Sequence, residues 1–164
     1  TEISHLTEQI NEIISAIIDS NKNYIVIHPN NDKGRDVIYE SILKRLTKKT
    51  RFRILPSLRF ENFLILLKNS KFILGNSSAG IIEAPVYGIP TINVGSRQNN
   101  RLQNNKILNV NPICDEIIKA IKKSKVYEPE LLFGKGNSAK LFMKYLNDGN
   151  LWDLAIQKYF NDIY

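Results

Sequence analysis

The chain reads Phe72-Ile73-Leu74-Gly75-Asn76-Ser77-Ser78-Ala79-Gly80-Ile81-Ile82-Glu83-Ala84-Pro85 across the stretch that decides its fold. Residues 72–74 are typical of a buried strand, and residues 78–87 are compatible with a helix. The small residues between them would let an anion approach the backbone N–H groups and the positive end of the helix dipole. The same residues would also suit an ordinary strand-to-helix turn with a serine N-cap.

Strand and helix patterns alternate along the rest of the chain. Apolar spacing predicts helices near residues 5–19, 38–46, 60–67 and 113–121, and apolar runs predict strands at 24–28, 51–55, 91–94 and 107–110. Because these strands are continuous apolar runs, we expect a parallel sheet covered by helices on both faces. The predicted fold is a Rossmann-like three-layer α/β/α domain over residues 1–164, with C-terminal helices from about residue 139, the last of them at 152–163.

The composition narrows the class of protein. The 164 residues include a single cysteine and two histidines. The lone Cys114 excludes an internal disulfide and is typical of a reducing compartment, so a cytoplasmic protein is expected. Cysteine and histidine are too few for a zinc site of the usual spacing, and we expect neither a metal nor a cofactor. No apolar run reaches the ~18 residues of a membrane span, and the first residues do not resemble a signal peptide.

The net charge of +7 is compatible with nucleic acid or with small anions. The basic residues are spread along the predicted helices, and no aromatic residues alternate with them as in a platform for single-stranded nucleic acid. We therefore interpret them mainly as a solvated surface that also favours anionic small molecules. Neither nucleic acid nor a membrane is expected as a partner.

Polar clusters follow three of the predicted strands. They are His28-Pro29-Asn30, Gly75-Asn76-Ser77-Ser78 and Gly95-Ser96-Arg97. Ligands of parallel sheets bind beyond the carboxyl ends of the strands, so these clusters predict a binding site at one edge. The chain has no Gly-Lys-Ser/Thr phosphate loop, and no Gly-x-Gly-x-x-Gly follows a strand, which makes it unlike a kinase or a dehydrogenase.

The candidate side chains suit the parts of a nucleoside diphosphate. Ser77 and Ser78 offer hydroxyl and N–H groups to a phosphate, and the carboxylate of Glu83 suits the vicinal hydroxyls of a ribose. Arg97 offers a forked cation to a phosphate, and Arg101 adds positive charge. Simpler roles stay open for the same set of residues: helix caps for Ser77 and Ser78, surface charges for Glu83, Arg97 and Arg101, and turn residues for His28, Asn30 and Asp32.

Four motifs in this order resemble the C-terminal half of UDP-N-acetylglucosamine 2-epimerases. They are His28-Pro29-Asn30-x-Asp32-x-Gly34, the run from Gly75 to Pro85, Gly95-x-Arg97-Gln98-x-x-Arg101, and Gly134-x-Gly136-Asn137-Ser138-Ala139. The resemblance covers nearly the whole chain. The Asn76-Ser77-Ser78 variant and the Arg97-Gln98-x-x-Arg101 ending are similar to the hydrolysing branch, which makes N-acetylmannosamine and UDP for sialic acid-type sugars.

The resemblance implies a GT-B-type protein of two Rossmann-like domains, with a UDP-sugar between them. It implies that Ser77 and Ser78 hold the diphosphate and that Glu83 holds the ribose. It further implies that Arg97 and Asn30 contact the nucleotide or the sugar phosphate, and that the backbone near Phe63 reads the uracil. His28 and Arg101 complete the list of residues that we expect to bind UDP.

The family's acid–base carboxylates lie in its N-terminal domain, which this chain lacks. We therefore expect no catalytic residue here, a missing N-terminal domain as partner, a homo-oligomer, and no activity of the chain alone. The start at Thr1-Glu2 looks like the end of a segment that follows the first strand of the family's second domain. That strand is central in a Rossmann order, so a gap in the sheet is expected.

Two other functions stay open. A nucleotide-sugar-binding domain of a GT-B glycosyltransferase shares the diphosphate site, although the Arg97-Gln98-x-x-Arg101 ending favours the epimerase. A basic Rossmann domain that binds nucleic acid is disfavoured, because the basic residues form no stripe. The sugar also stays open between N-acetylglucosamine and a 4-acetamido-6-deoxy analogue.

Overall fold

The computed structural model describes residues 6–29, 34–99, 101–102, 104–149 and 152–153. The chain forms two compact units, which divide after Glu130. The second unit contains one described helix, α6 (Ser138–Leu146), and the indole Nε1 of Trp152 donates to the carbonyl of Leu146 at 3.0 Å. The second C-terminal helix that the sequence predicts falls almost entirely outside the described residues.

The first unit alternates strands and helices as the apolar pattern predicts. Its elements in chain order are α1 (Leu6–Asp19), β1 (Tyr24–Ile27), α2 (Arg35–Leu46), β2 (Phe52–Leu55), α3 (Phe60–Lys68), β3 (Ile73–Gly75), α4 (Ala79–Ile82), the 3-10 helix η2 (Ala84–Tyr87), β4 (Thr91–Val94), β5 (Ile107–Val110) and α5 (Cys114–Lys123). The predicted α/β class is confirmed, since all the strand pairs are parallel.

The described strands form two sheets rather than one. β1 pairs with β2, and the second sheet has the order β3-β4-β5. In the second sheet Gly75 lies opposite Asn93, and Asn93 lies opposite Asn109. No described strand joins β1 and β2 to the sheet of β3, β4 and β5.

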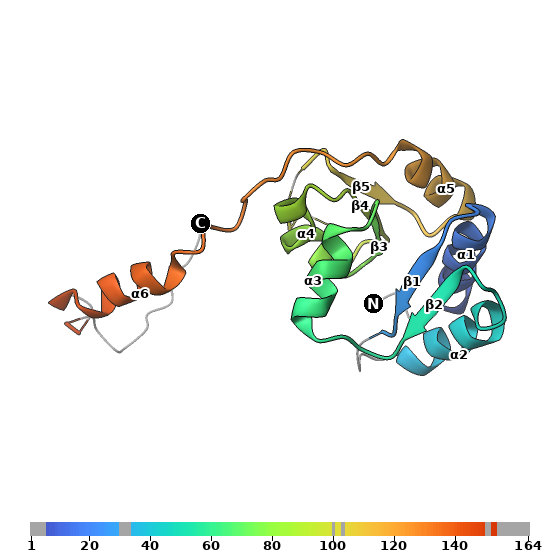
Figure 1. The fold of residues 1–164 in the computed structure, drawn as a ribbon, viewed down its shortest axis with the longest axis horizontal. Coiled ribbons are helices and arrows are strands. Elements are labelled where there is room, and N and C mark those ends of the chain that lie inside the picture. Colours follow the sequence, from blue (N-terminus) through green and yellow to red (C-terminus); the bar gives the residue numbers. More distant parts are fainter. Residues whose placement is uncertain (1–5, 30–33, 100, 103, 150–151, 154–164) are drawn as a thin grey trace, which may run out of the picture. The chain divides into compact units, whose positions relative to one another are not determined.

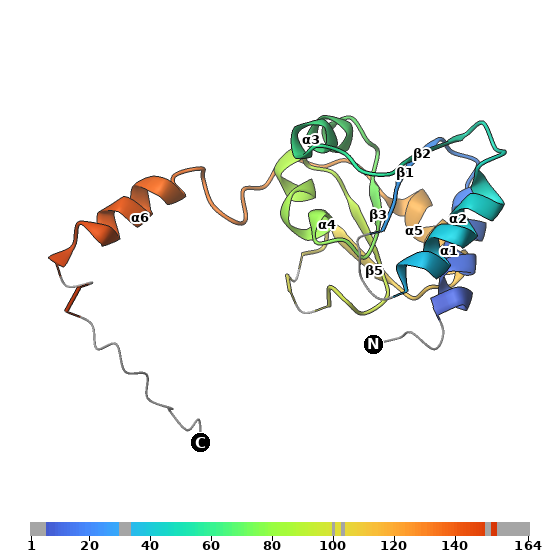
Figure 2. The same ribbon diagram turned by 90° about the horizontal axis from the view of Figure 1, so that it is seen from below.

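Helices lie on both sides of the strands, with α1, α2 and α5 on one side and α3 and α4 on the other (Figures 1 and 2), whereas Ile25 and Ile27 of β1 are exposed. Helix α1 joins the two sheets because its apolar residues belong to two core clusters. Ile10, Ile14 and Ile17 pack with α2 and β2, whereas Ala16 packs with β4 and α5. On the other face, Leu67 of α3 packs with Ala84 and Ile89 around η2 and the start of β4.

An extended segment after α5 lies against η2. The N–H of Tyr127 donates to the carbonyl of Gly88 at 2.9 Å, and the N–H of Glu130 donates to the carbonyl of Pro85 at 2.8 Å. Gly88 has φ +67°, and a Cβ there would overlap the Tyr127 carbonyl, so only glycine fits. Asn104, in the loop before β5, donates to the Glu130 carboxylate at 2.9 Å. These bonds hold the segment in place beside the C-terminal half of the sheet.

Candidate functional site

The loop between β3 and α4 presents backbone N–H groups at the surface. The strand ends at Gly75, whose φ of +138° is a backbone conformation that side chains disfavour. Ser77 is exposed and Ser78 is half-buried, and the carbonyls of both accept bonds from the turn that follows. Within the described residues, the N–H groups of Ser77 and Ser78 have no acceptor. The predicted phosphate-binding loop therefore has two donors available for a ligand.

The helix after this loop is shorter than the sequence suggests. The predicted helix at 78–87 is divided into α4, which ends at Ile82, and η2, which begins at Ala84. Pro85 has no N–H to donate, so the α-helical ladder cannot continue through this position. With only four residues in α4, a helix dipole contributes little here, and the loop amides carry the anion-binding potential.

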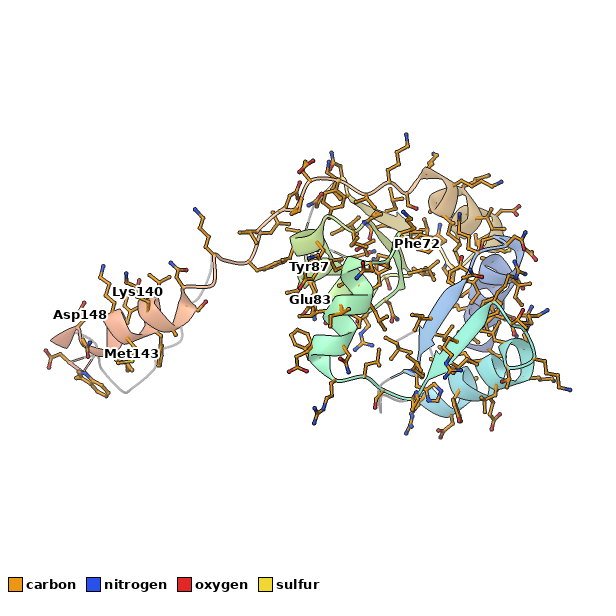
Figure 3. All side chains as sticks on the ribbon, in the orientation of Figure 1. Phe72, Glu83, Tyr87, Lys140, Met143 and Asp148 are labelled. Atoms are coloured by element: carbon orange, nitrogen blue, oxygen red, sulfur yellow. The ribbon has the colours of Figure 1, made fainter. Side chains whose placement is uncertain are left out.

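Glu83 stands at the junction between α4 and η2. Its side chain is half-buried, and Tyr87 of η2, labelled in Figure 3, packs against the cluster that includes Leu67 of α3. The carboxylate oxygen Oε2 is buried and has no hydrogen-bond partner among the described residues. A buried acceptor without a donor is costly, so this oxygen is suited to a ligand that brings hydroxyl groups.

Phe63 packs into the core beside this junction. Its half-buried ring belongs to the cluster of Leu67, Ala84 and Ile89, and its N–H donates to the carbonyl of Arg59 at 3.0 Å. The ring of Phe63 therefore supports the position of η2, which follows Glu83. A backbone that reads uracil in this segment would have to use groups other than the Phe63 N–H.

A buried glutamine joins the loop after β4 to the β3–α4 loop. Gln98 is only 4% exposed, and its Nε2 donates to the carbonyl oxygen of Asn76 at 2.8 Å. Arg97, the residue before it, is exposed, as is Arg101, whose N–H approaches the Gln98 carbonyl at 3.4 Å. The Gln98 bond therefore connects the segment that carries Arg97 with the segment that carries Ser77.

Gln98 received no role from the sequence, although it stands inside a motif. A glutamine between two arginines is equally compatible with solvent, and only the approach of residue 76 buries it. The burial of Asn93 could not be predicted from the sequence for a similar reason. It is 1% exposed in β4, and its Nδ2 donates to Oδ1 of Asn109 at 2.7 Å.

His28 lies at the end of β1, in the other sheet. Its N–H donates to the carbonyl of Leu55 at 3.0 Å, and its ring packs edge-on against Tyr39 of α2 with 4.5 Å between the centroids. These contacts support a packing role at the strand end, and a role in UDP binding stays a prediction. Asn30 and Asp32 lie outside the described residues.

A polar pocket of about 200 Å³ lies at the carboxyl ends of β4 and β5. It is lined by Gly95, Ser96, Asn99, Asn109, Val110, Asn111 and Pro112. The backbone N–H of Asn111 donates to the Glu116 carboxylate at 3.1 Å, which fixes one wall of the pocket.

Within the described part of the chain, no group of three or more acidic, histidine or cysteine residues could hold a metal ion. None of the described helices has the length and apolarity that a membrane span requires.

Comparison with known proteins decides the family. The sequence profile of the UDP-N-acetylglucosamine 2-epimerases matches residues 1–147. The chain belongs to the UDP-N-acetylglucosamine 2-epimerase family. The resemblance found in the four motifs is thereby confirmed.

The relatives of this family member include epimerases and a polysialic acid biosynthesis protein. The chain is 38% identical to the UDP-N-acetylglucosamine 2-epimerase of Neisseria meningitidis serogroup B, over 99% of this chain and 44% of that protein. It is 36% identical to polysialic acid biosynthesis protein P7 of Escherichia coli, over 73% and 31%. It is 32% identical to the UDP-N,N'-diacetylbacillosamine 2-epimerase (hydrolyzing) of Legionella pneumophila, over 75% and 32%. The chain spans less than half the length of these relatives.

A solved structure shares the fold. The UDP-GlcNAc 2-epimerase of Methanocaldococcus jannaschii, in complex with UDP-GlcNAc and UDP, matches 87% of this epimerase-family chain and 41% of its own chain, with a TM-score of 0.71 and 22% sequence identity. This likeness confirms the predicted fold class, a Rossmann-like α/β domain of the kind found in the C-terminal half of GT-B-type proteins. The assignment to the epimerase family also favours the first predicted function over the glycosyltransferase alternative.

Proposed function

We propose that this chain is the UDP-binding half of a hydrolysing UDP-N-acetylglucosamine 2-epimerase. The observation that carries the proposal is the buried, unpartnered Oε2 of Glu83. A ribose diol would supply the hydroxyl donors that this oxygen lacks. The N–H groups of Ser77 and Ser78 would then bind the diphosphate, with Arg97 adding positive charge.

The proposed reaction divides between this chain and the rest of a longer protein. Removal of the C2 proton and cleavage of the bond between C1 and the UDP oxygen form a C1–C2 double bond and release UDP. Water then adds a hydroxyl to C1, and a proton returns to C2 on the opposite face, which gives N-acetylmannosamine. The residues of this chain bind UDP and stabilise the negative charge that develops on the leaving diphosphate.

The base for the C2 proton would lie outside this chain. A base must come within hydrogen-bond reach of the proton that it removes. Among the described residues, the acid at the proposed site is Glu83, which we assign to the ribose. The chain covers 44% of its Neisseria relative, which leaves room for a catalytic domain in the full-length protein.

The hydrolysing branch is favoured by two independent features. The Arg97-Gln98-x-x-Arg101 ending is similar to that branch, and the Legionella relative is named a hydrolyzing 2-epimerase. The name of the Escherichia coli relative refers to polysialic acid, for which an N-acetylmannosamine product is a suitable precursor. A cytoplasmic location and a homo-oligomer stay predictions.

The experiment is a product analysis with the full-length protein. UDP-N-acetylglucosamine and its UDP-linked 4-acetamido-6-deoxy analogue are incubated separately, and the free sugar and UDP are measured by NMR. The proposal expects one molecule of free sugar, inverted at C2, for each UDP released. Conversion to a UDP-linked sugar without release of UDP would contradict the hydrolysing mechanism, and transfer to an acceptor only would contradict the epimerase.

A further inference from the structure

We propose that Gln98 is a positioning residue that orients the diphosphate donors of the two loops at once. The inference rests on the proposed function, because it assigns Gln98 a task in the binding of UDP. Its basis is the bond of 2.8 Å from Gln98 Nε2 to the Asn76 carbonyl, which links segments 22 residues apart. Because Gln98 is 4% exposed whereas Asn76 is exposed, the buried side chain of Gln98 holds a loop at the surface.

The bond acts on Ser77 through the planarity of the peptide group. The carbonyl of Asn76 and the N–H of Ser77 belong to the same peptide and point in opposite directions when that peptide is trans. Holding the carbonyl toward buried Gln98 therefore turns the Ser77 N–H away from the interior. The same N–H has no acceptor among the described residues, as a donor reserved for a ligand requires.

The bond also acts on Arg97 through the chain. Gln98 is buried whereas Arg97, its neighbour, is exposed. Fixing the side chain of Gln98 under the loop limits the positions that the Arg97 backbone can adopt. The hydrogen bond from Gln98 to Asn76 thus sets the distance between the Ser77 N–H, which would bind one phosphate, and the Arg97 guanidinium, which would bind the other.

The Nε2 donor of Gln98, rather than the volume of its side chain, orients the loop. Its Oε1 is buried and has no partner among the described residues. Gln98 therefore does not belong to a hydrogen-bond network in which every polar atom is paired. An apolar side chain of similar length would fill the same space and avoid that unpaired oxygen. A glutamine that served packing alone could therefore be replaced by methionine without loss of ligand binding.

The test compares ligands that differ only in their phosphates. Dissociation constants for UDP, UMP and uridine are measured by calorimetry on the full-length protein and on its Gln98→Met variant. We expect Gln98→Met to weaken UDP binding about tenfold, which corresponds to one well-placed hydrogen bond, and to leave uridine binding within about twofold. Gln98→Glu keeps the length and polarity but loses the donor, and the same selective loss is expected from it.

A matched control removes the same kind of bond elsewhere. The Nδ2 of Asn69 donates to the carbonyl of Ile65 at 2.8 Å, at the C-terminal end of α3. Asn69→Leu therefore loses an amide-to-carbonyl bond of equal length, and we expect unchanged constants for all three ligands. The double variant Gln98→Met/Arg97→Met tests whether Gln98 acts through Arg97. If it does, the loss of UDP affinity in the double variant should be smaller than the sum of the losses in the two single variants.

Each outcome decides a different claim. If the unmodified protein binds UDP no more tightly than uridine, the proposed function is wrong, and the role of Gln98 falls with it. If the unmodified protein prefers UDP and Gln98→Met keeps that preference in full, only the role of Gln98 is wrong. An equal loss for UDP and uridine would make Gln98 a residue of general packing and would also overturn the inference.

Discussion

Thr91 contacts Gly80 in two ways. Its Oγ1 donates to the carbonyl oxygen of Gly80 at 2.5 Å, and its methyl carbon Cγ2 would lie 2.5 Å from a Cβ placed on Gly80. Both residues are buried, so β4 and α4 meet with no room for another side chain. This contact fixes the base of the loop that carries Ser77 and Ser78.

Replacing Gly80 by alanine should destabilise the protein. The added methyl group overlaps Thr91 Cγ2, and overpacking of this kind costs about 1–3 kcal/mol, whereas the gain in helix propensity is at most ~1 kcal/mol. Thermal unfolding of the full-length protein should show a lower Tm for Gly80→Ala. Adding Thr91→Ser removes the methyl group and keeps the hydroxyl, so it should restore part of the loss. An unchanged Tm in Gly80→Ala would mean that α4 shifts freely on β4.

Replacing Glu83 by glutamine should weaken UDP binding and leave the fold intact. The carboxylate can accept from both ribose hydroxyls, whereas the amide has one acceptor oxygen and two donors. We expect a loss of about fivefold to tenfold for UDP, together with an unchanged Tm, because an amide of the same size takes the place of the carboxylate.

The deoxynucleotide shows whether the ribose is the partner of Glu83. The unmodified protein should bind 2'-deoxy-UDP more weakly than UDP, and Glu83→Gln should discriminate little between the two. Glu61→Gln, at an exposed acid of α3, serves as the control for loss of one negative charge. Equal discrimination in all three proteins would leave Glu83 without a role at the ribose.

The segment after α5 should loosen in alkali because of Tyr127. Burial, with a smaller effect of the Glu130 carboxylate, raises the pKa of Tyr127 to about 12 from its usual 10.0. Since the folded-state pKa is the higher one, the associated stability is present below pH 10 and is lost as the pH rises toward 12. Tm measured from pH 8 to 11 should fall less steeply in Tyr127→Phe than in the unmodified protein. Burial also raises the pKa of Tyr24, so only the difference between the two curves isolates Tyr127.

The 164-residue chain alone should show neither epimerase nor hydrolase activity. Among the described residues, the acid at the proposed site is Glu83, which we assign to the ribose, and a second domain would be needed to exclude water from the elimination. The measurement is release of UDP from UDP-N-acetylglucosamine by the purified chain. Release that is lost on His28→Ala would make His28 the base and would overturn this division of labour.

Much of the fold follows from local pattern. Short apolar runs predict β4 at residues 91–94 and β5 at 107–110 with the observed bounds, because buried parallel strands need little else. The predicted helix at 78–87 is the clearest difference, since Pro85 interrupts its hydrogen bonds. The apolar spacing could not predict this break, because it continues through both α4 and η2.

The candidate site is harder to predict than the fold. Ser77, Glu83 and Arg97 could be selected because their chemistry matches a nucleotide. The burial of Gln98 depends on an approach between distant segments, and no local pattern distinguishes a buried glutamine from a solvated one. The unpaired Oε2 of Glu83 is likewise a property of the assembled core.

The central claim is that this chain binds UDP for a reaction that releases it. The most direct test follows UDP-N-acetylglucosamine with the full-length protein by NMR and compares the unmodified protein with Glu83→Gln and Arg97→Met variants. We expect equal amounts of UDP and free N-acetylmannosamine from the unmodified protein, with slower release and weaker UDP binding in the variants. A UDP-linked N-acetylmannosamine as the final product, or variants that bind UDP as tightly as the unmodified protein, would contradict it.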